Sequence, residues 1–77
     1  MVAEVILDWY RDGEQWVGGC DVLPNVLLLI VPSKWGKVVL RVYNKGNLVH
    51  EKEHGDADAA KAAAVMAGRL IAIREAV

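Results

Sequence analysis

Alanine dominates the last third of this 77-residue sequence and restricts what that segment can form. Nine alanines lie between Asp56 and Val77, and alanine has the highest helix propensity of all residues. Asp56 follows Gly55 and suits the N-cap, while Asp58 places a negative charge in the first turn, where the helix dipole favours it. The sequence therefore predicts one long helix over about 56–77.

Helical periodicity divides the residues of this segment between two faces. At about 100° per residue, one apolar stripe lies opposite a charged face that carries Lys61, Arg69 and Glu75. We expect the stripe to pack on a sheet built by the rest of the chain. The members of the stripe are Ala59, Ala63, Met66, Ala67, Leu70, Ile73 and Val77.

Strand and turn signals alternate through the middle of the chain. Residues 26–31 are apolar at every position, which predicts a central strand with both faces at least partly covered. Pro32 ends that strand, and residues 38–43 alternate, with the even-numbered residues inward and the odd-numbered residues outward. After a short loop at Asn44-Lys45-Gly46, residues 48–53 become polar and predict an edge strand whose charges discourage pairing with another chain.

The first segment, residues 2–10, fits either a strand or an amphipathic helix. We favour the strand, because Asp12-Gly13 is a strong hairpin signal. A two-residue turn there would place Trp9 directly opposite Trp16, and aromatic cross-strand pairs stabilise hairpins. A second strand over about 15–21 would follow, with a bulge or bend at Gly18-Gly19.

These elements predict an α+β fold for a single domain that spans residues 1–77. An antiparallel meander of four to five strands, over about 2–53, precedes one C-terminal helix over 56–77 that packs on one sheet face. A chain of this length with 55% apolar residues has the composition of a folded core and not that of a disordered segment.

Charge and composition exclude several functional classes. A formal net charge of −1 gives no overall attraction to nucleic acid or to anionic membranes. The longest apolar run is six residues, far short of the roughly 20 that a spanning helix requires. The single Cys20 has no intramolecular partner, and residues 1–8 lack the basic start of a secretory signal. We therefore expect a soluble cytoplasmic protein with no membrane contact.

No constellation of reactive side chains indicates chemistry. His50 and His54 would share one strand face, but their Cα atoms would lie about 13 Å apart, too far for two ligands of one metal ion. Cys20 has neither an orienting third group nor a glycine-bearing elbow that would present the thiol. We expect no metal, no cofactor and no enzymatic activity.

The distribution of charge is more informative than the total. Five acidic residues precede residue 22, whereas five basic residues lie between Ser33 and Lys52. Trp35 stands within the basic turn, where it either folds over the sheet edge or serves as an anchor for a partner, because tryptophan and arginine are enriched at binding hot spots. We predict one partner-binding patch formed by Lys34, Trp35, Lys37, Arg41 and Tyr43.

The same region carries a resemblance to two kinds of protein. Trp35, the strand over 38–42, the Gly46 turn and the run Asp56-Ala57-Asp58-Ala59-Ala60-Lys61 resemble a pattern of small phage and prophage proteins. Such proteins are often accessory factors or inhibitors that occupy a host protein surface, anti-CRISPR proteins among them. The resemblance thus implies a non-enzymatic protein-binding module whose partner is a host protein or protein complex.

The same run is also similar to AP2 and integrase-type DNA-binding domains, in which a three-stranded sheet backed by a helix enters the major groove. That resemblance implies a reading surface on residues 38–43 with Arg41, and on the Lys34–Lys37 turn. The sequence departs from it, since a single Arg41 stands between Val39 and Tyr43 and the first hairpin is acidic.

Self-association is the last expectation from the sequence. Residues 26–31 are apolar on both faces, whereas one helix covers only one of them. A homodimer would cover the remainder, unless the hairpin with Trp9 and Trp16 folds over the open face. The residues that we assign to this dimer or packing surface are Leu28, Ile30, Val65 and Ile71.

Overall fold

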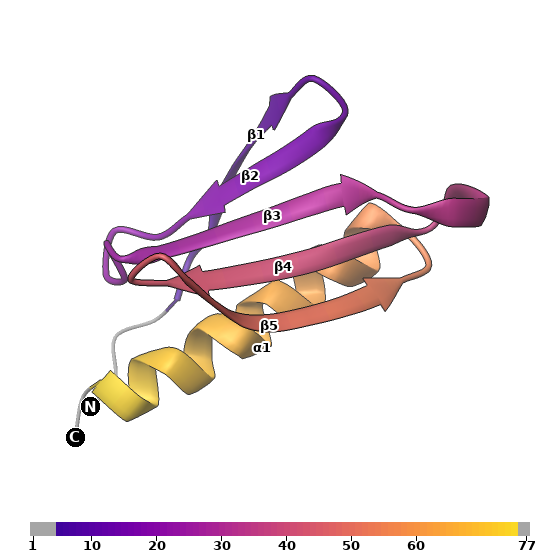
Figure 1. Ribbon diagram of the computed structural model, residues 1–77. Helices are drawn as coiled ribbons and strands as arrows, with labels where there is room; N and C mark the ends of the chain where they lie inside the picture. The colour runs from indigo at the N-terminus through magenta and orange to yellow at the C-terminus, as the bar shows by residue number, and fades with distance from the viewer. Residues whose placement is uncertain (1–4, 76–77) are drawn as a thin grey trace.

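A computed structural model describes residues 5–75, which form one five-stranded antiparallel sheet and one helix. Each strand pairs with the next strand along the chain, so the sheet order is β1-β2-β3-β4-β5, and α1 lies across one face (Figure 1). This arrangement confirms the predicted α+β fold. The predicted ends at residues 2–4 and 76–77 fall outside the described residues. The elements are β1 Asp8–Asp12, β2 Gln15–Gly19, β3 Val26–Pro32, the 3-10 turn η1 Lys34–Gly36, β4 Val38–Asn44, β5 Asn47–His54 and α1 Ala57–Glu75.

The core lies between β3, β4 and the helix. Leu28, Ile30, Leu40 and Val42 are the largest fully buried side chains, and they come from alternate positions of the two central strands. Each such side chain contributes on the order of 1.5–3 kcal/mol to the free energy of unfolding. The predicted central strand and the predicted inward face of 38–43 are therefore both confirmed.

The first hairpin forms, but in a different register from the predicted one. Asp12 pairs with Gln15, so the turn residues are Gly13 and Glu14, and Gly13 has the positive φ of 63° that glycine tolerates at the first turn position. Trp9 consequently lies opposite Gly18 and not opposite Trp16. The predicted bulge at Gly18 and Gly19 does not form in the pairing of β1 with β2. A register shift occurs instead in the pairing of β4 with β5, between Val42 and Tyr43.

The segment 5–7 belongs to no strand or helix, so neither predicted alternative applies there. Val5 is nevertheless buried in the core. A Cβ on Gly68 would lie 3.0 Å from its Cγ1, so the glycine allows this segment to approach the helix closely.

The helix begins as predicted, but it is rotated about its axis relative to the expected stripe. Asp56 Oδ1 accepts a hydrogen bond from the Ala59 amide at 2.8 Å, which caps the first turn. The buried positions are Ala60, Ala64, Gly68 and Ile71. Large members of the predicted stripe lie instead at the surface: Met66 and Leu70 are each 58% exposed and Ile73 is 50% exposed.

The prediction is therefore wrong for the large members of the stripe, whereas Ala63 and Ala67 do pack against the core. Small residues at the buried positions let the helix axis come close to the sheet. No helix among the described residues has both the length and the apolar character needed to cross a bilayer.

Candidate functional site

The hairpin between β3 and β4 ends in a tip that projects from the sheet (Figure 1). Trp35 and Gly36 have consecutive positive φ values of 61° and 72°, and the Lys37 amide donates to the Lys34 carbonyl at 3.1 Å. These features are those of a type I′ turn, which favours asparagine and glycine. Trp35 occupies a position that suits small residues, and its side chain is 91% exposed.

Trp35 does not fold back over the sheet edge, which was one of the two alternatives. A left-handed conformation costs a residue with a Cβ on the order of 1–2 kcal/mol. With so little of the indole buried, packing within the chain cannot offset that cost. The tryptophan at this position therefore works against the stability of the isolated chain.

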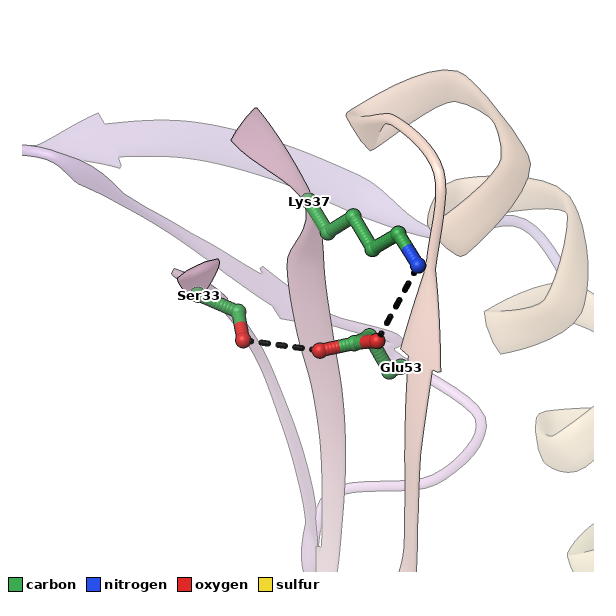
Figure 2. A network of polar contacts seen from close by, with 3 residues as sticks. All are labelled: Ser33, Lys37 and Glu53. Atoms are coloured by element: carbon green, nitrogen blue, oxygen red, sulfur yellow. Dashed lines mark hydrogen bonds and ion pairs between the residues drawn. The ribbon is translucent and has the colours of Figure 1, made fainter. Parts of the chain in front are cut away.

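Two of the predicted basic residues are held by carboxylates of β5. Lys37 Nζ lies 3.6 Å from Glu53 Oε1, and the Ser33 hydroxyl donates to Glu53 Oε2 at 2.9 Å, so a single carboxylate joins both sides of the tip to the edge strand (Figure 2). Arg41 Nε donates to Glu51 Oε2 at 2.7 Å. Pairs this exposed contribute about 0–1 kcal/mol each, but they offset the positive charge of the patch.

Arg41 and Tyr43 lie on the open face of the sheet, opposite the helix. The register aligns Tyr10, Val17, Leu29, Arg41 and Glu51 in one row across all five strands. Val17 is buried although it does not belong to the core cluster under the helix. The row is thus apolar at its centre and charged at the β5 side.

The open face has further apolar members that the sequence analysis did not single out. Leu27 pairs with Tyr43, Val31 pairs with Val39, and Leu48 lies across Tyr43 on β5. Residues 26–31 are all apolar, so the sequence does not indicate which of them face the helix and which lie on the open face. We use the name open apolar face for the residues Tyr10, Val17, Leu27, Leu29, Val31, Val39, Tyr43 and Leu48.

Of the two roles predicted for Leu28, Ile30, Val65 and Ile71, a dimer surface or a packing surface, the structure bears on the second. Leu28 and Ile30 are buried under the helix, and Ile71 packs in the same cluster. Val65 is half-buried on α1. Leu28, Ile30 and Ile71 therefore form the packing surface of one chain and are not accessible to a second copy.

Trp9 and Trp16 also face the helix and do not cover the open apolar face. Both rings pack against the core cluster, and Lys61 Nζ of α1 lies 3.6 Å from the centroid of the Trp16 ring and 6.0 Å from that of Trp9. Arg11 lies over Trp16 as well, at 5.1 Å. These cation–π contacts link the first hairpin to the helix.

The two histidines share the helix side of β5, as expected for a strand that runs through His54. His50 pairs with Val42 and His54 pairs with Val38. Among residues 5–75, no three side chains of histidine, cysteine, aspartate or glutamate are placed to hold a metal ion. Cys20 is a buried free thiol.

A groove runs between β5 and α1. Its strand wall carries His50, Lys52 and His54, and its helix wall carries Ala63, Met66, Ala67 and Leu70. The groove continues past Val49 toward Arg74 and Glu75 at the end of the helix. The residue pattern did not indicate this groove, because helical periodicity assigned Met66 and Leu70 to the face that packs on the sheet.

No protein-family model matches this sequence, and the comparisons with curated proteins and with solved structures likewise give no match. The resemblances to phage accessory proteins and to AP2-type domains therefore stay predictions.

Proposed function

We propose that this chain is a protein-binding module, without enzymatic activity, that engages a partner through Trp35 and the adjoining open apolar face. The observation that supports the proposal most is the exposure of Trp35 at a strained turn position. Burial of the Trp35 side chain in a complex would offset the free energy that its strained turn conformation costs the isolated chain. Tryptophan is the residue most enriched at binding hot spots.

The neighbouring groups suit a protein surface better than a phosphate backbone. Lys37 and Arg41 are each paired with a carboxylate, so the local positive charge that DNA binding requires is largely offset. The open apolar face adds leucine, valine and tyrosine side chains, which bind apolar groups on a partner. In line with the phage resemblance, we propose a host protein as the partner and occupation of its surface as the mode of action.

The test compares the wild-type chain with Trp35→Gly and with Val22→Ala. Val22 is exposed in the loop between β2 and β3, at the opposite end of β3 from the tip, and serves as the control. Each immobilised variant is incubated with the same bacterial lysate, and the retained proteins are quantified by mass spectrometry. A partner retained by the wild type is then purified for a titration.

We expect Trp35→Gly to weaken binding about 30-fold or more, as for a hot spot worth 2 kcal/mol, while Val22→Ala leaves it unchanged. The melting temperature of Trp35→Gly should not fall, because relief of the left-handed strain offsets the added chain entropy of glycine. Identical retained proteins for wild type and Trp35→Gly would contradict the proposal. A gel shift with duplex DNA that is tight at low salt and falls steeply with added salt would favour the AP2-like alternative.

A further inference from the structure

The outer edge of β5 is open in the described part of the chain. β5 is eight residues long and pairs only with β4. An unpaired edge presents a row of backbone N–H and C=O groups to which an extended segment of another protein can add as a further strand. Besides its length, this edge has an apolar ridge of α1 beside it and charges that differ between its two faces.

The first feature is the ridge on α1 formed by Met66, Leu70 and Ile73, of which Met66 and Leu70 border the groove beside β5. All three side chains are at least half exposed, although smaller residues of the same helix are buried. Met66 and Leu70 form one wall of the groove whose other wall is β5. A strand added to β5 would direct every second side chain toward this ridge.

The second feature is the separation of charge between the two faces of β5. His50, Lys52 and His54 lie on the helix side, whereas Glu51 and Glu53 lie on the open side with Arg41 and Lys37. Paired residues of antiparallel strands lie on the same face, about 4.5–5.5 Å apart. A complementary strand therefore has a carboxylate between apolar residues on the helix side and basic residues on the open side.

The same charges disfavour a second copy of this chain in the registers centred on the charged residues of β5. The two-fold axis that relates antiparallel copies of β5 keeps the helix sides of both copies together. A register centred on Glu51 or Glu53 would place that carboxylate against its own copy. A register centred on Lys52 would oppose two ammonium groups and would place Glu51 against Glu53. Like charges directly opposite each other destabilise a pair of strands. Centred on His50, two copies would place Lys52 against Leu48 and Glu51 against Val49, which leaves these charges without partners.

We propose that the free edge of β5 and the α1 ridge together accept an extended segment of a different protein. The segment pairs antiparallel with β5, contacts Met66 and Leu70 with apolar side chains, and places a carboxylate opposite Lys52 and basic residues opposite Glu51 and Glu53. Trp35 takes no part in this site, although Glu53 also holds Lys37 and Ser33 of the tip. The two proposals are measured on different residues, so either can fail without the other.

The probe is the capped heptapeptide Thr-Leu-Lys-Glu-Lys-Leu-Thr, titrated into isotopically labelled protein and followed by amide and methyl NMR shifts. Its glutamate is designed to lie opposite Lys52. One control is the charge-reversed peptide Thr-Leu-Glu-Lys-Glu-Leu-Thr. A second control carries N-methyl groups on the amides that would face β5, which removes backbone pairing while the charges stay the same.

We expect shifts that saturate for the β5 amides and the Met66 methyl group, and binding about tenfold weaker for both control peptides. Lys52→Glu should lower the affinity for the probe by a similar factor, and Leu70→Ser should lower it while the exposed position keeps the fold intact. Val22→Ala should not change it. The absence of shifts at millimolar peptide, equal binding of the charge-reversed peptide, or shifts confined to other strands would each overturn the proposal.

Discussion

Gly18 shows how a single position determines the packing of the first hairpin. A Cβ built on Gly18 would lie 2.7 Å from two atoms of the Trp9 ring, whereas a Cβ on the neighbouring Gly19 would meet nothing within 4 Å. We expect Gly18→Ala to lower the free energy of unfolding by about 1–3 kcal/mol, because the indole must leave its position. Gly19→Ala is the matched control, with an expected effect within about 0.5 kcal/mol. Urea denaturation of both variants tests the difference, and equal midpoints would contradict it.

The register of this hairpin could not be derived from the residues alone. The Asp12-Gly13 pair correctly predicts a turn, but two adjacent turns of the same length are compatible with it. The observed turn places Gly13 at the position that requires positive φ and lets the Trp9 ring lie over a residue without a side chain. The predicted pair of Trp9 with Trp16 rests on the residues that would face each other in one register, and the pattern of residues gives no information on the space above Gly18.

At the scale of elements, the strands were predictable and the orientation of the helix was not. The alternation of residues 38–43 identified the inward face correctly, because burial on a strand follows every second residue. On α1 the same reasoning assigned the large residues Met66, Leu70 and Ile73 to the sheet. The helix packs on the sheet through Ala60 and Ala64 instead, and Gly68 lies against Val5 and Leu23, which are outside the strands. Close approach of two backbones requires small side chains.

This orientation of the helix can be tested with two alanines of α1. Ala64 is fully buried, while Ala62 is exposed on the same helix. We expect Ala64→Leu to lower the free energy of unfolding by about 1–3 kcal/mol, because the added atoms force the helix away from β3 and β4. Ala62→Leu should change it by no more than about 0.5 kcal/mol. Thermal unfolding followed by circular dichroism measures both variants. If Ala64→Leu leaves the stability unchanged, the described orientation of the helix is contradicted.

At the scale of the whole molecule, α1 covers one face of the sheet, and no helix or strand among residues 5–75 covers the open apolar face. We expect purified protein to self-associate weakly through this face, because apolar area of this kind is stabilised by burial. Leu29 lies at its centre, so Leu29→Lys should give the mass of a single 8.4 kDa chain in sedimentation equilibrium. Met66→Lys, outside the face, is the control and should not change the mass.

A single-chain mass for the wild-type protein at micromolar concentration would contradict this expectation. If association is observed, it occupies the face that we propose for the partner, so the two interactions compete. The apparent affinity for the partner should then fall as the concentration of this chain rises, by mass action.

The order of strands also has a consequence for synthesis. Each strand pairs with its predecessor in the chain, so every hairpin can close as soon as its second strand has left the ribosome. The helix emerges after all five strands, so until then the face with Leu28, Ile30, Leu40 and Val42 lacks the cover that α1 provides. We therefore expect a nascent chain that ends near residue 55 to expose more apolar surface, and to bind chaperones more, than one that includes Ile71.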